Sequence, residues 1–174
     1  MDEKSRVFVR KKKDDSLRLE IRTLKPSWLM LCVLFALGLI CLIFPFSLLF
    51  VTALDIGVGY VITLIIFLGS SIFFFRNFLW SLHGKEVYDI SSNKLEYYYD
   101  YKLFKDNLNS LLLSDLKIGY CKKNNPNDVI MHSKMGRVDD FDCYLVFVNK
   151  EEFIKSSIAV HYKNVNDVVN SLGY

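Results

Sequence analysis

Four cysteines and three histidines are the side chains of this sequence best suited to nucleophilic or metal chemistry. Thiols and imidazoles hold zinc when they recur at short, paired spacings. The cysteines stand instead 9, 80 and 22 residues apart, at Cys32, Cys41, Cys121 and Cys143. We therefore expect no zinc site, no other metal and no cofactor.

Cys143 would be a nucleophile if His132 or His161 served as its base. Catalytic thiols need a lowered pKa, and no neighbouring residue in the sequence marks Cys143 in this way. Cys143 also continues the alternation of its segment, which is typical of a small buried side chain. The sequence thus favours a non-enzymatic protein, and an enzyme acting at a membrane surface is the residual alternative.

Two further groups have simpler interpretations than catalysis. His83 follows a long apolar segment, where an imidazole contacts lipid headgroups or caps a helix; the alternative is a pH sensor. Asp139, Asp140 and Asp142 form an acidic segment that we interpret as a solvated loop, with weak cation binding as the alternative. The sequence contains no phosphate-binding glycine loop and no metalloprotease or serine-hydrolase motif.

The sequence is divided sharply into an apolar stretch and charged stretches, and the elements that position these residues must form from them. Residues 27–75 contain one formal charge, Asp55, whereas the rest of the chain holds all 22 Lys and Arg. About 20 apolar residues of helix cross a bilayer, so this stretch is long enough for two spans. We predict a transmembrane helical hairpin over residues 27–79, with spans at about 28–52 and 56–75. This division excludes a soluble globular protein, a large channel or transporter and a multidomain enzyme.

Basic residues flank the outer ends of both predicted spans and are absent from the turn between them, so both termini are expected to be cytoplasmic. Trp28, Arg76 and Trp80 stand at these boundaries as membrane-interface anchors. A cleaved signal peptide is a weaker interpretation of the first span, because the preceding 26 residues contain 14 charges. We predict an integral membrane protein with two spans.

Alternation of apolar and polar residues dominates the charged parts of the chain. Residues 16–22 alternate between polar and apolar side chains at every position, and residues 6–10 are expected to form a shorter strand before them. This pattern predicts a β-hairpin within residues 1–26. A two-stranded hairpin is not stable alone in water, so the arm is expected to join the domain formed by residues 80–174.

The predicted elements after the second span are short antiparallel strands followed by one helix. The strands are expected at residues 85–90, 95–102, 111–120, 129–132, 143–148 and 157–162. The apolar positions of the closing helix are Val165, Val168, Val169 and Leu172. With the arm, the sequence predicts six to eight strands and a C-terminal helix around one core.

The order of these elements resembles a group of bacterial membrane proteins with a pleckstrin-homology-like (PH-like) domain beside two transmembrane helices. The likeness is carried by the segment Leu-Trp-Ser-Leu-His-Gly-Lys-Glu at residues 79–86, the strand at 87–90 and the closing helix. The resemblance implies a membrane α-helical hairpin plus a mainly-β cytoplasmic domain, an antiparallel β-sandwich or barrel with a C-terminal helix. It also implies a bacterial inner membrane, and binding or scaffolding more often than catalysis.

We therefore expect a membrane-anchored, non-enzymatic binding or assembly module that presents its cytoplasmic domain to a protein partner or to a second copy. The alternative is an anionic-lipid sensor. Lys11, Lys12 and Lys13 lie between the first two strands, where PH domains often hold phosphoinositides, and each would gain about 1 kcal/mol at an anionic surface. A solubilising turn is the simpler interpretation of these lysines. Nucleic acid is not expected, because residues 76–174 hold 13 basic and 13 acidic side chains.

Overall fold

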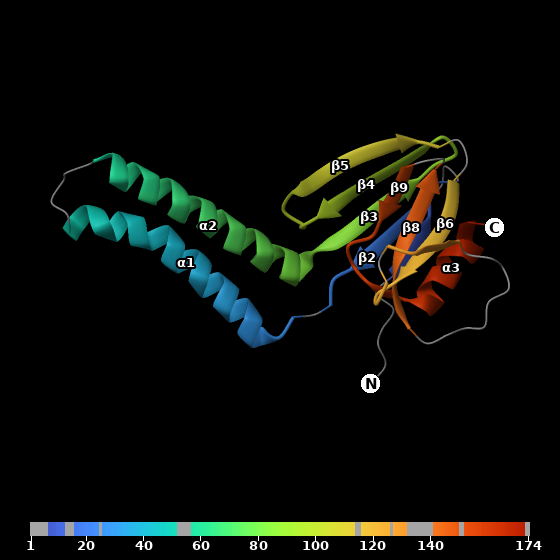
Figure 1. Cartoon of the computed structure of the whole chain (residues 1–174), viewed down its shortest axis with the longest axis horizontal. Helices are drawn as coiled ribbons and strands as arrows, with labels where there is room; N and C mark the ends of the chain where they lie inside the picture. Colours follow the sequence, from blue (N-terminus) through green and yellow to red (C-terminus); the bar gives the residue numbers. More distant parts are fainter. Residues whose placement is uncertain are drawn as a thin grey trace. The chain divides into compact units, whose positions relative to one another are not determined.

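The structure, a computed structural model, describes residues 7–12, 16–24, 26–51, 57–113, 116–125, 127–131, 141–149 and 152–172. The chain divides into two compact units, one made of residues 1–23 and 85–174 and the other of residues 24–84. The second unit is helical and is inserted between two strands of the first (Figure 1). Each unit is described in turn.

The helical unit consists of α1 (Trp28–Val51) and α2 (Val58–His83). Both helices are long and apolar enough to cross a membrane, as the composition predicts. At one level of the hairpin the Tyr60 hydroxyl donates a hydrogen bond to the Pro45 carbonyl (3.1 Å). Near this level the rings of Phe44 and Phe67 lie with their centroids 4.8 Å apart. Packing between the two helices is therefore both aromatic and polar.

A small residue in each helix lets the hairpin pack closely. The Ser71 hydroxyl donates a hydrogen bond to the Gly38 carbonyl (3.0 Å), and Ser71 is buried. A Cβ atom at Gly38 would lie 3.2 Å from the Phe75 ring, so the ring would have to shift by a few tenths of an ångström to admit a larger residue.

The second helix continues past the predicted end of its span, at about residue 75, and ends at His83. Arg76 therefore lies within α2 and not after it. Residues 76–83 contain neither glycine nor proline, so nothing in them stops the helix. At its end the Gly84 N–H donates to the Trp80 carbonyl (2.7 Å), and a Cβ atom at Gly84 would overlap that oxygen and the indole. Glycine is thus required where the chain leaves α2.

Sheet A of the β unit joins the N-terminal arm to the strands that follow α2. Its strand order is that of the sequence: β1 (Val7–Lys11), β2 (Leu17–Arg22), β3 (Lys85–Ile90), β4 (Lys94–Asp100) and β5 (Lys105–Leu112). All neighbouring strands are antiparallel. The pairing of β2 with β3 runs from Leu17 opposite Ile90 to Arg22 opposite Lys85. Two strands far apart in the sequence are therefore central neighbours in the sheet.

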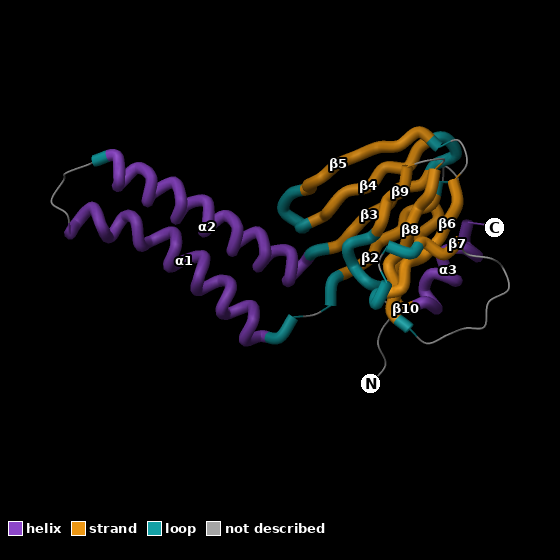
Figure 2. Tube along the Cα trace, in the orientation of Figure 1, coloured by secondary structure: helices purple, strands orange, loops and turns teal. Residues whose placement is uncertain are grey.

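Sheet B is built from the rest of the chain and is closed by a helix. Its order is β10 (Val160–His161), β8 (Asp142–Asn149), β6 (Leu116–Lys122) and β7 (Val129–Met131), and β9 (Glu152–Lys155) also pairs with β8. Helix α3 (Tyr162–Leu172) follows β10 directly (Figure 2). It contacts β1, β8 and β10. Two antiparallel sheets and a C-terminal helix confirm the predicted mainly-β domain.

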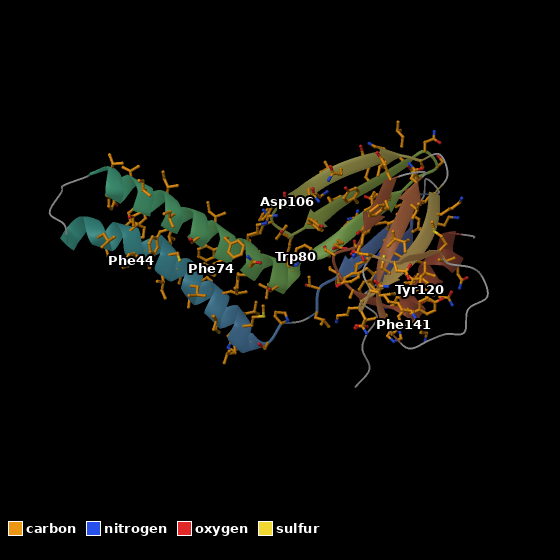
Figure 3. The ribbon with its side chains drawn as sticks, viewed as in Figure 1. Phe44, Phe74, Trp80, Asp106, Tyr120 and Phe141 are labelled. Atoms are coloured by element: carbon orange, nitrogen blue, oxygen red, sulfur yellow. The ribbon has the colours of Figure 1, made fainter. Side chains whose placement is uncertain are left out.

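One hydrophobic core lies between the two sheets and α3. Its most deeply buried members include Leu19, Ile21, Leu145, Phe147, Val165 and Val168. An aromatic cluster packs against this core, where the ring of Phe141 lies 5.7 Å from that of Tyr120 and 4.9 Å from that of Tyr162 (Figure 3). Val165, Val168 and Val169 of the apolar face predicted for the closing helix are buried, which confirms them, and the side chain of Leu172 lies outside the described residues.

Two of the predicted strands are wrong. Residues 111–120 do not form one strand, because 105–112 form β5 of sheet A and 116–122 form β6 of sheet B. The first six residues of β5 read Lys-Asp-Asn-Leu-Asn-Ser, which have low strand propensity, so pairing with β4 decides their structure. Residues 157–162 contain only the two residues of β10 before α3 begins at Tyr162, and β9 was not predicted.

Candidate functional site

Cys143 lies in β8 and is fully buried. Burial, aided by the nearby charge of Asp142, raises the pKa of its thiol to about 12. Val160 stands opposite Cys143 in β10, and His161 stands opposite Asp142. Because successive side chains of a strand point to opposite faces, the imidazole of His161 and the thiol of Cys143 lie on different faces. The described strands thus do not join them as base and nucleophile, and His132 lies outside the described residues.

Acidic and thiol side chains are scattered through the fold. Among the residues that the structure describes, no group of three His, Cys, Asp or Glu could hold a metal ion. Asp142 pairs instead with Lys123 (3.8 Å), and Asp139 and Asp140 lie outside the described residues. Cys121 is buried, which raises the pKa of its thiol.

The lysines proposed for lipid binding lie at the hairpin that joins β1 to β2. Lys11 ends β1, and the backbone N–H of Lys12 donates to the Ser16 carbonyl (2.8 Å). The Lys12 ammonium pairs with the carboxylate of Asp89 in β3 (3.0 Å), so part of its charge is neutralised. Lys13 lies outside the described residues. Lys12 is therefore already paired with an acidic side chain.

The two ends of sheet A differ in their connection to the helices. At one end, which we call the helix-connected end, Arg22 is six residues before α1 and Lys85 is two residues after α2. At the other, distal end, Lys11 pairs with Leu17 in the hairpin. Five residue steps along a strand separate these ends, about 17 Å. The lysine hairpin is thus at the distal end of the sheet.

The predicted interface anchors belong to the helical unit. Trp28 is the first residue of α1, and Trp80 lies in the last turn of α2. Arg76 lies one turn before Trp80, within the same helix. Their contact with a bilayer stays a prediction.

A network of ion pairs covers the outer face of sheet A. At its centre is Glu20 of β2, which is only 5% exposed although it faces away from the core. It contacts Lys85 (3.3 Å), Arg18 (3.2 Å) and Arg22 (3.6 Å). Burial alone raises the pKa of Glu20, but the three cations outweigh it, Lys85 most strongly, and lower the pKa below its ordinary value. Lys85 also pairs with Asp100 (3.4 Å), which extends the network to β4.

Two cations of this face also cover Tyr98. The Arg18 guanidinium donates a hydrogen bond to the Tyr98 hydroxyl (3.0 Å), and the Lys105 ammonium lies 4.5 Å from the centroid of its ring. Tyr98 and its neighbour Val87 are consequently buried on a face that carries many charges. These charges pair with one another, so we assign them to the stability of the sheet.

Sequence reasoning did not single out Glu86, a carboxylate in β3 that is 1% exposed. Glu86 accepts hydrogen bonds from the Ser157 N–H (2.8 Å), from the Ser157 hydroxyl and from the Tyr88 hydroxyl (3.1 Å). Burial raises its pKa, because these neutral donors compensate only in part. The sequence contained one indication of this site: Glu86, Tyr88 and Ile90 are alternate residues of β3, so their side chains share the inner face of the sheet. The cluster ties the segment between β9 and β10 to sheet A. The Glu86 carboxylate is buried, whereas Ser157, which donates to it, is exposed.

Sheet A ends in a strand, β5, that exposes apolar side chains. In the described strand order β5 is the last strand and pairs with β4. Leu108 is 68% exposed and Leu112 is 77% exposed. Asn107 has a positive φ of 53° at a bulge opposite Tyr98. We call Leu108, Leu112 and the outer backbone edge between them the β5 edge surface, because such edges accept a strand from another chain.

The turn between β4 and β5 is also apolar at its tip. The Tyr101 N–H donates to the Phe104 carbonyl (3.0 Å), and the two rings stack with their centroids 4.5 Å apart. Lys102 has a φ of 73°, and its N–H donates to the Asp100 carboxylate (2.8 Å). This hydrogen-bonded turn holds Leu103 outward, where it is 75% exposed.

No protein-family model and no curated protein sequence matches this chain. The function must therefore be inferred from the chain's own surfaces. Among the described residues of the β unit, the three most exposed large apolar side chains are Leu112, Leu103 and Leu108, which belong to the β5 edge surface and to the turn that precedes it; Phe153 of β9 follows at 66%.

Proposed function

We propose that this protein is a membrane-anchored, non-enzymatic binding or assembly module that engages a protein partner through the β5 edge surface. α1 and α2 serve as the two spans, and both termini lie on the cytoplasmic side of a bacterial inner membrane. The β unit acts as a PH-like domain. Its two antiparallel sheets and closing helix support that assignment.

The exposure of β5 carries this proposal. A partner strand that pairs with the outer edge of β5 would extend sheet A by main-chain hydrogen bonds. It would also cover Leu108 and Leu112, and burial of their apolar surface would stabilise the complex by roughly 25 cal/mol for each Å² removed from water. The bulge at Asn107 interrupts the regular edge, and the Asn149 amide already donates to the Leu112 carbonyl (2.8 Å), so strand addition is expected over residues 108–111.

The insertion of the helices within sheet A supports a binding role at a membrane. The chain leaves sheet A after β2 and returns to it at β3, so the β unit is tethered through two neighbouring strands. Two tethers restrict rotation more than one. A domain held in this way favours partners that are themselves attached to, or assembled on, the same membrane.

Site-specific photo-crosslinking in native membranes tests this proposal. A photoreactive amino acid at Leu112 of the full chain should yield a defined adduct with one partner protein or with a second copy. The matched control is the same amino acid at Arg10, which is exposed on the opposite edge strand, β1. Leu108→Lys should abolish the Leu112 adduct without unfolding the domain, since Leu108 is already exposed.

Two outcomes would contradict the proposal. One is the same set of adducts from Leu112 and from Arg10, which would indicate random collisions in the membrane. The other is a Leu112 adduct that persists unchanged when Leu108 carries a charge.

A further inference from the structure

We propose that the β4–β5 turn, residues 101–104, is a membrane-contact element that places Leu103 and Phe104 in the headgroup region of an anionic bilayer. The inference rests on the proposed anchoring by α1 and α2. It concerns a lipid surface and a different set of residues from the β5 edge surface.

The geometry of the turn presents an apolar tip to solvent. Leu103 is 75% exposed and Phe104 is 42% exposed, whereas Tyr101 beneath them is buried. The stacked rings of Tyr101 and Phe104 and the Tyr101–Phe104 backbone hydrogen bond fix this arrangement. The stability of the fold in water does not explain an exposed leucine on this hydrogen-bonded turn, because its side chain buries little apolar surface.

The backbone of the turn retains a lysine at an unfavourable position. Lys102 has a positive φ of 73°, a backbone conformation that has a steric cost for any residue other than glycine. Glycine would relieve that cost but would remove a cation next to Leu103. Strain that persists at an exposed position points to a use for the side chain.

The charges beside the tip match an anionic interface. Lys102 precedes Leu103 and Lys105 follows Phe104, and both lysines are exposed, although the Lys105 ammonium also lies over the Tyr98 ring. Asp100 and Asp106 flank the two lysines, and Asp100 pairs with Lys85 (3.4 Å). Long basic side chains place their ammonium groups among phosphates while adjacent apolar groups enter the acyl boundary. An apolar tip between two lysines is the pattern that such a surface binds.

The turn lies at the end of sheet A that the chain connects to α2. Lys85, two residues after α2, stands opposite Asp100 in β4, and Asp100 stands opposite Lys105 in β5. The turn is therefore at the helix-connected end, about 10 Å across two strand spacings from the start of β3. If α2 emerges from the membrane near His83, chain connectivity keeps this end of the sheet near the interface.

The loop at the other end of the same strands provides the internal contrast. β3 and β4 are joined at the distal end by Ser91, Ser92 and Asn93, which are exposed and polar. β4 and β5 are joined at the helix-connected end by Tyr-Lys-Leu-Phe. Apolar and basic residues thus occur in the loop at the helix-connected end and polar ones in the loop at the distal end.

The experiment measures how close single positions of the full chain come to lipid. An environment-sensitive fluorophore is attached to Leu103→Cys, to Ser92→Cys and to Ile65→Cys, an exposed position of α2. The background carries Cys32→Ala and Cys41→Ala, while Cys121 and Cys143 are fully buried with raised thiol pKa values and resist labelling. Each variant is placed in nanodiscs of phosphatidylcholine and phosphatidylglycerol that contain a lipid-attached quencher.

We expect quenching and a blue shift at Leu103 and Ile65, and neither at Ser92. Lys102→Gln with Lys105→Gln should reduce quenching at Leu103 in anionic nanodiscs and leave it unchanged in phosphatidylcholine alone. A Leu103 label as unquenched as that at Ser92, with Ile65 quenched, would overturn the inference and leave the anchoring intact. An unquenched label at Ile65 would overturn the anchoring itself.

Discussion

Two buried glutamates lie on adjacent strands of sheet A and on opposite faces of it. Glu20 of β2 is 5% exposed on the outer face, and Glu86 of β3 is 1% exposed on the inner face. They are close in the sheet, since Glu20 stands opposite Val87 and Ile21 stands opposite Glu86. Their pKa values nevertheless shift in opposite directions.

The difference follows from the partners that each face supplies. The outer face surrounds Glu20 with three cations, and these stabilise its ionised form against the cost of burial. The inner face offers Glu86 hydroxyl and backbone donors, which are neutral, so burial dominates. Two carboxylates with little solvent exposure thus differ in charge because the two faces of one sheet supply different partners.

The largest effect is expected from placing a new charge on the inner face. Leu19→Asp in β2 would bury a carboxylate without Glu86's hydrogen bonds, because Leu19 is fully buried among apolar side chains. We expect the free energy of unfolding of the β unit to fall by about 3–5 kcal/mol. Pulse proteolysis of the full chain in detergent measures this change.

The matched control for that substitution is Leu112→Asp on the exposed edge of the same sheet. It should change the free energy of unfolding by less than about 0.5 kcal/mol. Equal costs for the two variants would mean that the arm preceding α1 is not part of the core.

The next largest effect is expected from breaking the network on the outer face. Lys85→Met removes a hydrogen-bonded cation from Glu20 and should lower the free energy of unfolding by about 1–3 kcal/mol. In a Glu20→Gln background the same change should cost much less, because the carboxylate that needs the cation is gone. Chemical denaturation of wild type, the two single variants and the double variant in one detergent gives the coupling energy between Lys85 and Glu20. Additive costs would show that Lys85 acts through Asp100 and not through Glu20.

Much of this architecture could be predicted from the sequence, because its signals are local. Alternation in residues 16–22 indicated β2, and the period of Val165, Val168 and Val169 indicated α3. Two apolar runs indicated the spans. The same alternation separates Leu17, Leu19 and Ile21, which belong to the core, from the charged residues between them.

The remainder depends on residues that are distant in sequence. Glu20 is buried because Lys85, which follows both helices, comes to lie beside it. Ser157 approaches Glu86 from the other sheet, 71 residues further along the chain. β5 has a low intrinsic propensity to form a strand, and it forms because it pairs with β4. No local pattern contains these partners, so the two glutamates and the edge surface had to be found in the structure.

The opposite pKa shifts predict opposite pH dependences. For Glu86, whose pKa is raised, the favourable protonated form is fully present below the ordinary carboxyl pKa and is lost as pH rises through the folded value. For Glu20, whose pKa is lowered, stabilisation is present above the ordinary pKa and is lost as pH falls through the folded value. The stability of wild type relative to Glu86→Gln should therefore fall with rising pH, and that relative to Glu20→Gln should rise. Unfolding curves over the acidic range measure both, and slopes of the same sign would contradict the contrast.

The smallest effect is expected from an exposed ion pair on the same outer face. Lys12 and Asp89 are both partly exposed, so Lys12→Gln should cost only about 0.2–1 kcal/mol. That cost should disappear in 1 M salt, where charges are screened beyond about 3 Å, whereas the cost of Lys85→Met should largely persist. A small, salt-sensitive pair is one that an anionic headgroup can displace, so Lys12 would remain available to lipid. If Lys12→Gln cost as much as Lys85→Met, Lys12 would be held firmly by Asp89. The lysine hairpin would then have one fewer charge for lipid recognition.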